Sequence, residues 1–413
     1  MSTAENSLSR KQIYRRRRVV IFGSAAVVLA AAVYTPLTLL APLEPVPAVA
    51  ASVAAPVSSP AQPVAPAYGA SGIGMTGADD LLVTAGSAEP LPIASVSKIV
   101  TALVVLDAKP IEAGAEGETL SFTSADVTIY NNYLAQNGSV KPVAAGESLS
   151  QRDVMELMLI GSANNYARSL VNWAFGSEQE YVAAATPWLS ENDMTSTSIT
   201  DSTGMSPLNT SVPADLVTLG ELAIADPVVS EIVAQKSVTV GDIGTFSNTN
   251  KLLGIDGIDG IKTGTLDEAG ACLLFSADVL VGDQTITLVG VVLGGPDHDV
   301  VDDSVRSLLE SVVAGFHQVT LATAGQSFAS YATAWGDSTD VVAAEDRSMV
   351  VWSDTPITAT ITTEDIALAE SGSNVGSVSF VSGTQQVEIP LVTTEPIEDP
   401  GAAWRLTNPG KLF

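Results

Sequence analysis

The chain has 413 residues, 46% of them hydrophobic, which is enough for two or three folded domains. Its formal net charge is −28, and the acidic body argues against nucleic-acid binding, because such binding depends on neutralising phosphates. The single cysteine, Cys272, excludes an internal disulfide, and the two histidines, His298 and His317, cannot supply a multi-histidine metal site. Neither histidine lies in a motif that supports a Ser-His-Asp triad.

The N-terminal segment combines a basic tail, residues 1–18, with an uncharged run over residues 19–43. The run is long enough to cross a hydrocarbon core of about 30 Å, and the basic tail predicts a cytoplasmic N-terminus. A cleavable signal peptide is the alternative, because Ala48-Val49-Ala50 fits a cleavage pattern. The length of the run favours an uncleaved, single-pass signal anchor in the cell membrane. Both interpretations place the body outside the cytoplasm, the second as a protein secreted after cleavage near Ala50.

Residues 44–67 are rich in alanine and proline and carry no charge after Glu44. Such a segment cannot build a core and predicts a semi-rigid, extended tether. We expect this tether to hold the body away from the membrane.

The most informative stretch runs from Leu91 to Leu106, after one or two strands predicted in residues 68–94. It predicts a central helix whose first turn carries Ser95 and Lys98 on one face. Burial would lower the pKa of Lys98, which could then take a proton from Ser95. The alternative is a capping serine beside a lysine that snorkels to the surface.

Residues 110–141 are expected to form loops and strands. A helix then begins at Ser150 with a variant capping box and ends at Gly161. Ser162 and Asn164 follow on a short connection to another apolar helix, where side chains can point into a cleft. A capping serine and a turn asparagine are the alternative interpretation.

Lys262-Thr263-Gly264 is expected to begin a strand in which Gly264 permits close approach of an extended ligand. Further elements are predicted around it: a helix over residues 213–224, an antiparallel hairpin of residues 271–277 and 285–293, and a helix over residues 300–316. From residue 318 onward, short β-branched runs separated by polar turns predict a small all-β domain, residues 318–413.

Three motifs occur in a fixed order along the chain. Ser95-Val96-Ser97-Lys98 is the only S-x-x-K, Ser162-Ala163-Asn164 follows, and Lys262-Thr263-Gly264 is the only K-[ST]-G. Their order and context match the penicilloyl-serine transferase pattern. With its flanking residues, the chain resembles the low-molecular-mass serine D-alanyl-D-alanine carboxypeptidases over residues 68–317.

That resemblance implies an α+β fold. The catalytic domain, residues 68–317, would be β-lactamase/transpeptidase-like, with an antiparallel sheet flanked by helices plus a helical subdomain, and the all-β domain would follow it. The resemblance also implies an enzyme that needs no metal or organic cofactor.

The resemblance implies catalytic and substrate-binding roles for several residues. Ser95 would be acylated, Lys98 would be its base, Ser162 and Lys262 would pass a proton to the leaving D-alanine, and Asn164 would hold Lys98 and the substrate amide. The substrate-binding residues would be Lys262, Thr263, Gly264 and Thr265, with backbone N–H groups of Ser95 and Thr265 forming the oxyanion hole. Thr265 stands where the family more often has His or Tyr. We expect Lys98 to be partly neutral, and Lys262, on an open strand edge, to stay charged.

The resulting hypothesis is a carboxypeptidase that removes the terminal D-alanine from peptidoglycan stem peptides ending in D-Ala-D-Ala and is inhibited by β-lactams. A β-lactamase or D,D-endopeptidase on the same fold is the alternative. Asp201 in place of a glutamate disfavours the lactamase. A wall-binding protein with residual catalysis is the third possibility.

Overall fold

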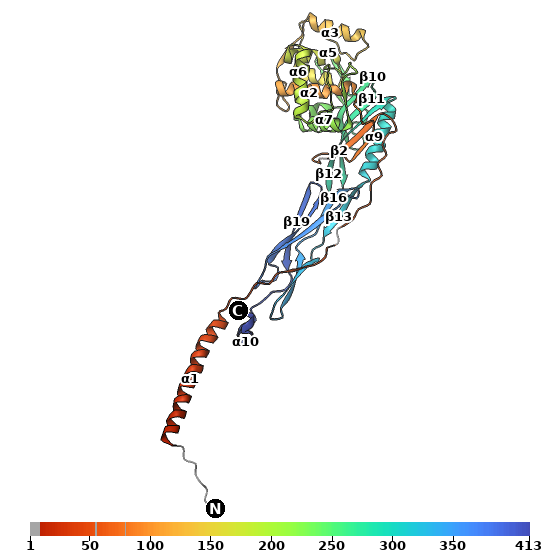
Figure 1. The fold of residues 1–413 in the computed structure, drawn as a ribbon. Helices are drawn as coiled ribbons and strands as arrows, with labels where there is room; N and C mark the ends of the chain where they lie inside the picture. Colours follow the sequence, from red (N-terminus) through yellow and green to blue (C-terminus); the bar gives the residue numbers. More distant parts are fainter. Residues whose placement is uncertain (1–8, 54–55, 79) are drawn as a thin grey trace, which may run out of the picture. The chain divides into compact units, whose positions relative to one another are not determined.

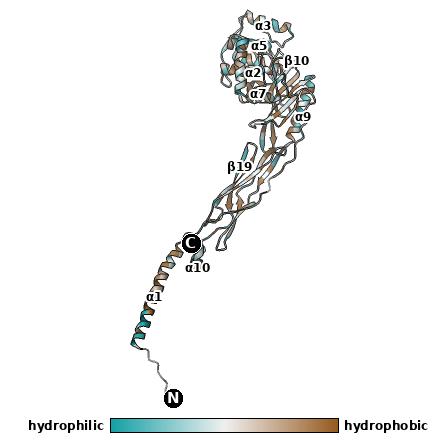
Figure 2. Ribbon diagram, in the orientation of Figure 1, coloured by the Kyte–Doolittle hydropathy of each residue, from teal (hydrophilic) through white to brown (hydrophobic). Residues whose placement is uncertain are grey.

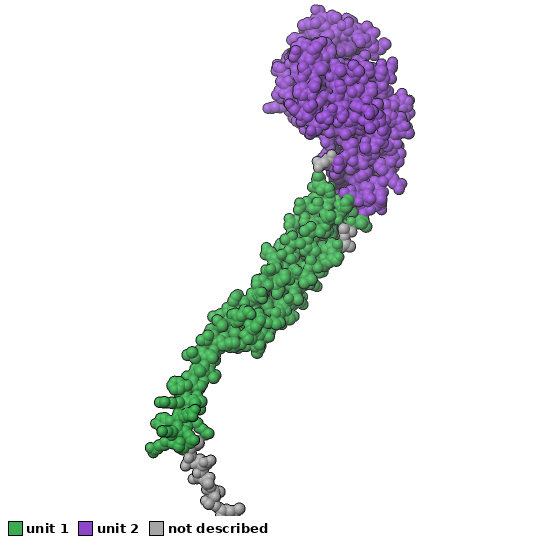
Figure 3. Space-filling model, in the orientation of Figure 1, with its two compact units in different colours: residues 1–57, 319–349, 356–413 green, residues 58–318, 350–355 purple. Residues whose placement is uncertain are grey.

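The computed structural model describes residues 9–53, 56–78 and 80–413, so the first eight residues of the expected basic tail lie outside the described residues. The chain forms two compact units (Figure 3). The central unit comprises residues 58–318 and 350–355, and the terminal unit comprises residues 1–57, 319–349 and 356–413. The sequence of the central unit is thus inserted into that of the terminal unit.

The central unit contains a five-stranded antiparallel sheet (Figure 1). Its strand order is β10 (Ile258–Leu266), β11 (Gly270–Val281), β12 (Gln284–Gly295), β2 (Ala70–Met75) and β3 (Val83–Gly86). β11 and β12 form the predicted hairpin, with Val281 opposite Gln284 and a turn in which Gly282 has φ +63°. Among the described residues β10 pairs only with β11, so it is an edge strand of this sheet.

Alternate residues of β11 enter two separate hydrophobic cores, because side chains alternate between the faces of a strand. Cys272 and Leu274 belong to the core that the sheet shares with most of the helices. Leu273 and Phe275 belong to a second core, to which α9 (His298–Val313) contributes. The predicted helix over residues 300–316 corresponds to α9, which covers this second face, but it ends at Val313 and Phe316 belongs to the next strand.

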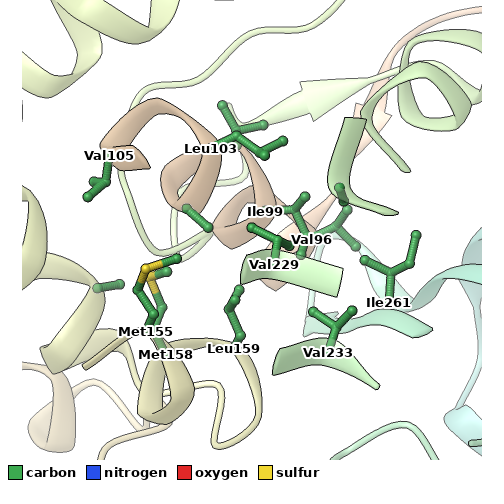
Figure 4. Packing of buried hydrophobic residues seen from close by; sticks show 14 of the residues in the cluster. Val96, Ile99, Leu103, Val105, Met155, Met158, Leu159, Val229, Val233 and Ile261 are labelled. Atoms are coloured by element: carbon green, nitrogen blue, oxygen red, sulfur yellow. The ribbon is translucent and has the colours of Figure 1, made fainter. Parts of the chain in front are cut away.

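The helical part of the central unit is organised around α2 (Ser97–Ala108), ten of whose twelve residues are buried. Ile99 and Leu103 of α2 belong to the same hydrophobic cluster as Met155 and Met158 of α4, and Figure 4 labels these residues. This part also contains α4 (Gln151–Leu159), α5 (Asn164–Phe175), α6 (Glu178–Glu191), α7 (Pro213–Ala225) and α8 (Pro227–Val233). The predicted central helix and the helices after Ser150 and at Pro213 are therefore confirmed.

Short strand pairs connect these elements: β4 (Leu91–Pro92) with β7 (Thr210–Ser211), β5 (Thr119–Ser121) with β6 (Ser148–Ser150), and β8 (Ser237–Val240) with β9 (Gly244–Ser247). The expectation of loops and strands over residues 110–141 is wrong in one respect, because α3 (Ser124–Ala135) lies there. No residue of α3 is buried, so its sequence lacks apolar periodicity. Thr123 and Asp126 begin it with a capping box.

The terminal unit contains a six-stranded sheet, and the α+β fold class with a C-terminal β region is confirmed. The strand order is β1 (Val49–Ala50), β14 (Ser327–Ala332), β15 (Ser338–Ala343), β19 (Gln385–Thr393), β18 (Asn374–Ser382) and β17 (Thr358–Thr363). β13 (Phe316–Ala322) pairs with β16 (Arg347–Trp352). A short α-helix, α10 (Gly401–Thr407), and a 3₁₀ turn, η2 (Pro409–Lys411), follow the strands. The region expected to be all-β therefore also contains helical residues.

The proline-rich segment after residue 43 is extended, as expected, but it is not a free tether. β1 pairs with β14, with Val49 opposite Ser330 and Ala50 opposite Ala329, and Val46 forms a bridge with Ile366. These pairs use backbone groups, which an edge strand offers to any extended segment. The segment therefore adds a strand to the sheet of the terminal unit.

The first helix, α1 (Arg10–Leu39), begins earlier than the uncharged run and includes the basic residues. Figure 2 shows hydrophilic residues at its N-terminal end and mostly hydrophobic ones beyond. It is long and apolar enough to cross a membrane. A signal sequence near the N-terminus can have the same length and hydropathy. Near its C-terminal end, Tyr34 Oη donates to the carbonyl oxygen of Leu406 at 2.7 Å.

Candidate active site

Ser95 lies in η1 (Ala94–Val96), a single 3₁₀ turn directly before α2 rather than in its first α-helical turn. Two glycines allow other segments to approach this turn closely. A Cβ on Gly204, which has φ +80°, would lie 1.9 Å from the carbonyl oxygen of Ala94. A Cβ on Gly264 of β10 would lie 3.2 Å from the backbone nitrogen of Ser95. The serine is thus held between the loop of residues 201–206 and the edge strand β10.

The structure brings Ser95 and Lys98 together, as the S-x-x-K spacing indicates. Lys98 Nζ donates to Ser95 Oγ at 2.8 Å and to the carbonyl oxygen of Thr203 at 2.6 Å. The Lys98 side chain is fully buried, and this burial holds the pKa of Lys98 well below its ordinary value. The positive charge of Lys262 lowers that pKa further, while Asp201 opposes the shift. Lys98 therefore has the position and the basicity of a proton acceptor for Ser95.

Asp201 organises the loop that carries Thr203. Its Oδ1 accepts hydrogen bonds from the backbone N–H groups of Thr203 and Gly204, both at 2.6 Å, and its Oδ2 accepts one from Ser206 N–H at 2.5 Å. The Thr203 hydroxyl donates to Oδ1 as well. The carboxylate is thus occupied by its own loop and fixes the carbonyl group that holds Lys98.

Ser162 and Asn164 occupy the predicted connection, although Asn164 is already the first residue of α5. Ser162 has φ +54°, and Asn164 is 3% exposed. Among the described residues, no hydrogen bond joins the side chain of either residue to Lys98 or Lys262, and Asn164 Oδ1 is buried without any partner. A buried amide oxygen without a partner is costly unless a ligand supplies the donor. Asn164 can therefore accept a hydrogen bond from a bound amide.

Lys262, Thr263, Gly264 and Thr265 follow one another along β10, and Lys262 differs from our expectation. It is 1% exposed rather than open at the strand edge, and its Nζ donates to the carbonyl oxygen of Thr263 at 3.1 Å. Burial lowers the pKa of Lys262 to about 7, with a further contribution from the charge of Lys141. A pKa of about 7 makes Lys262 partly neutral at neutral pH, whereas we expected it to stay charged.

Two contacts fix the threonines of β10. The hydroxyl groups of Thr263 and Thr249 lie 2.5 Å apart, and Thr265 Oγ1 lies 2.6 Å from His298 Nε2. His298 is the first residue of α9, after the N-cap Asp297. The sequence places His298 at a helix start, but nothing in it indicates the contact with Thr265, which is 33 residues away.

The comparisons with known proteins agree with this geometry. The family profile for D-alanyl-D-alanine carboxypeptidase matches residues 76–297, more than half of the chain, and the chain belongs to that family. The resemblance drawn from the three motifs is thereby confirmed. The matched segment includes every site residue from Ser95 to Thr265.

Two relatives from Escherichia coli illustrate the range of the family. The chain is 30% identical to a D-alanyl-D-alanine endopeptidase over 210 residues, which are 48% of this chain and 62% of that protein. It is 26% identical to D-alanyl-D-alanine carboxypeptidase DacC over 333 residues, which are 78% of this chain and 82% of that protein. A second endopeptidase, from Pseudomonas aeruginosa, is 30% identical. The chain spans about three fifths of the length of the two endopeptidases.

Solved structures share the fold. Penicillin binding protein 5 from Haemophilus influenzae superposes with a TM-score of 0.57 at 19% identity, covering 84% of this chain and 100% of that one. A point mutant of the Streptomyces K15 DD-transpeptidase superposes with a TM-score of 0.52 at 20% identity, covering 59% of this chain and 96% of that one. The β-lactamase/transpeptidase-like fold is thus confirmed.

Proposed function

We propose that the chain removes the terminal D-alanine from peptidoglycan stem peptides through an acyl-enzyme on Ser95, and that β-lactams acylate the same serine. The observation that carries this proposal is the 2.8 Å contact between Ser95 Oγ and a buried Lys98 whose pKa is lowered. A neutral amine at hydrogen-bond distance from a hydroxyl is the arrangement of an activated nucleophile. Membership of the carboxypeptidase family supports the choice of substrate.

In the acylation step, Lys98 takes the proton of Ser95 Oγ as this oxygen attacks the carbonyl carbon between the two D-alanines. The backbone N–H groups of Ser95 and Thr265 stabilise the negative oxygen that forms. When the C–N bond breaks, Lys262 supplies a proton through Ser162 to the amine of the leaving D-alanine. Water then attacks the acyl carbon as the bond to Ser95 Oγ breaks, one water proton restores the Ser95 hydroxyl, and the shortened peptide leaves as a carboxylic acid that ionises in water. Transfer of the proton held by Lys98 to Lys262 returns both lysines to their starting states.

Substrate binding uses the remaining groups of the site. Asn164 Oδ1, buried without a partner, accepts a hydrogen bond from an amide N–H of the peptide. Thr263 and Lys262 bind the free carboxylate of the terminal D-alanine. Gly264 leaves the backbone of β10 open to an extended peptide.

We also propose a role for each segment. Residues 1–18 form a cytoplasmic tail, residues 19–43 an uncleaved signal anchor, residues 44–67 a linker, residues 68–317 the penicillin-binding serine peptidase domain and residues 318–413 the C-terminal domain. The length and hydropathy of α1 support the anchor, and the basic residues at its N-terminal end support a catalytic body outside the cytoplasm.

The proposal is tested by labelling with a fluorescent penicillin. Ser95→Ala should abolish labelling while circular dichroism and the melting temperature stay close to those of the parent. Ser124→Ala, which changes an exposed serine at the start of α3, should label like the parent. Persistent labelling of folded Ser95→Ala would exclude Ser95 as the nucleophile.

A D,D-endopeptidase is the second candidate, and the names of the two relatives at 30% identity favour it. Both activities would use the same acyl-enzyme and differ in the leaving group. Turnover of a D-Ala-D-Ala peptide, a cross-linked peptide and a penicillin should be compared side by side. Preferential cleavage of the cross-linked peptide would establish the endopeptidase, and rapid turnover of the penicillin would establish a β-lactamase.

A further inference from the structure

Thr265, whose backbone N–H belongs to the proposed oxyanion hole, points its side chain to the face of the sheet away from Ser95. The register of β10 shows this, because directly opposed residues of an antiparallel pair lie on the same face. Gly264 is opposite Cys272, which belongs to the core that also contains the neighbours of Ser95 in its turn. Thr265 is opposite Ala271, which belongs to the core to which α9 contributes. Successive residues of β10 therefore face the nucleophile and α9.

His298 of α9 contacts Thr265 on this second face, with 2.6 Å between His298 Nε2 and Thr265 Oγ1. The backbone of His298 is itself held in place. The N-cap Asp297 accepts a hydrogen bond from the backbone N–H of Val300 at 2.9 Å, which closes the first turn of α9. Val301, in the same turn, is fully buried in the second core. His298 thus reaches Thr265 from a fixed helix start.

The surroundings of the imidazole determine which atom donates in this hydrogen bond. His298 Nδ1 is buried and, within the part of the chain that the structure describes, has no hydrogen-bond partner. Burial also lowers the pKa of His298, and the charge of Asp302 opposes this shift only in part, so the ring is neutral at pH 7. A proton on Nδ1 would be a buried donor without an acceptor, which is costly. The proton therefore lies on Nε2, and His298 donates to Thr265 Oγ1.

We propose that His298 is a positioning residue that fixes the Thr265 N–H of the oxyanion hole at its distance from Ser95. The inference rests on the proposed function for the acylation of Ser95 and for the oxyanion hole. On one face of β10, Gly264 lies so close to the nucleophile that an added Cβ would be 3.2 Å from Ser95 N. On the other face, His298 holds Thr265. Because β10 is an edge strand, this second contact replaces the support of a neighbouring strand.

A positioning role of this kind has a kinetic signature. The oxyanion hole meets a full negative charge only as the tetrahedral intermediate forms, so its geometry affects the transition state more than the bound ligand. Loss of a whole oxyanion donor slows a reaction on the order of a hundredfold or more. A donor that is displaced but still present should cost less. We therefore expect His298 to act on the rate of acylation and to leave the preceding binding step almost unchanged.

Acylation kinetics with a chromogenic penicillin separate positioning from binding. His298→Leu keeps an apolar side chain of moderate size and removes the donor. It should lower the rate constant of acylation at saturation about tenfold, and change the dissociation constant of the preceding complex less than about twofold. His298→Gln, whose amide can place an N–H near the position of Nε2, should recover most of the rate. His317→Leu changes the other histidine, which lies on β13 and contacts the carbonyl oxygen of Ser59, and should acylate like the parent.

A double-mutant cycle tests the path through Thr265. Thr265→Val removes the acceptor and keeps the branched shape, and because Thr265 is exposed this variant should fold even where His298→Leu does not. Its rate constant should fall by a similar factor, and combining it with His298→Leu should add little.

Two results would overturn the inference: an unchanged rate constant in either single variant, or losses that multiply in the double variant. Equal losses in rate and binding, together with a lower melting temperature, would also overturn it, because His298 would then only support the fold. Failure of the proposed function has a different signature. The penicillin would then still acylate Ser95 with this dependence on His298, while the D-Ala-D-Ala peptide is not hydrolysed.

Discussion

Lys98 Nζ donates to the carbonyl oxygen of Thr203 at 2.6 Å, across a separation of 105 residues in the sequence. Asp201 fixes the backbone of Thr203 and Gly204, so the position of the Lys98 amine is set by a loop far from its own helix. The amine is thereby directed at Ser95 Oγ, one turn away. A side chain with a different shape or basicity cannot make both contacts and accept a proton.

Replacing Lys98 by arginine should therefore remove acylation almost completely. Arginine keeps the charge but is not deprotonated in proteins, so it cannot act as the base. We expect the acylation rate of Lys98→Arg to fall at least about a hundredfold, the size of a lost general base. Stopped-flow measurement with a chromogenic penicillin gives this rate. Lys109→Arg, at the C-cap of the same helix, is the control; an unchanged rate in Lys98→Arg would place the base elsewhere.

The second-order rate constant for acylation should depend on pH through both lysines. It should rise with pH as Lys98 loses its proton, and fall again near pH 7 as Lys262, the proton donor with a pKa of about 7, becomes neutral. Lys262→Arg should weaken substrate capture and keep measurable acylation, but the fall at alkaline pH should disappear. An alkaline decrease that persists in Lys262→Arg would assign it to another group.

The buried Lys262 should also lower the stability of the fold. Its pKa of about 7 lies below the ordinary value of 10.5, so the unfolded chain binds more protons between these values and stability rises with pH in this window. Below pH 7 Lys262 is charged in the folded protein, and its burial then lowers the free energy of unfolding by at most about 5 kcal/mol. Lys262→Met should thus raise the melting temperature by several degrees at pH 6, and the gain should shrink by pH 9. Lys236→Met is the control. Equal melting temperatures of Lys262→Met and the parent at pH 6 would contradict the prediction.

Gly264→Ala should affect catalysis more than folding. The added Cβ would lie 2.9 Å from the carbonyl oxygen of Ile93 and 3.2 Å from Ser95 N, so β10 must move away from the turn that carries the nucleophile. We expect acylation to fall about tenfold or more through a widened oxyanion hole, with a small change in melting temperature. Gly410→Ala, where an added Cβ meets open space, should change neither quantity. Normal acylation by Gly264→Ala would mean that the close approach is not required.

The mature chain should keep its N-terminus and fractionate with membranes. The apolar part of α1 is longer than the core of a signal peptide, which favours retention. A variant that lacks residues 1–43 should appear in the soluble fraction and serves as the control. N-terminal sequencing that begins at Ala51 would establish cleavage instead, with loss of the strand that pairs with Ala329 and Ser330.

The sequence predicts those elements whose burial leaves a periodic or continuous apolar pattern. α2 and the hairpin of β11 and β12 are buried on most sides, so their residues form unbroken apolar runs. α9 is buried on one face and has a clear helical period. Ser95 and Lys98 could be paired from spacing alone, because helical geometry brings residues three apart together.

Other features depend on contacts that no local pattern encodes. α3 buries no residue, β1 pairs through backbone groups only, and the side chain of Lys141 lies against Gly161. The burial of Lys262 has no local sequence signal for a related reason. β10 is an edge strand in its sheet, but packing from other parts of the central unit covers this side chain.

The pairing of β1 with β14 has a consequence for biosynthesis. Val46 and Val49 are synthesised early, yet their partners Ile366 and Ser330 emerge about three hundred residues later, and Arg405 donates to the carbonyl oxygen of Ala41 across 364 residues. The intervening central unit has its own cores and can fold before the partners of β1 have been synthesised. The terminal unit can close only when nearly the whole polypeptide has been synthesised. Contacts so distant in sequence form slowly, so completion of this unit should be the last step of maturation.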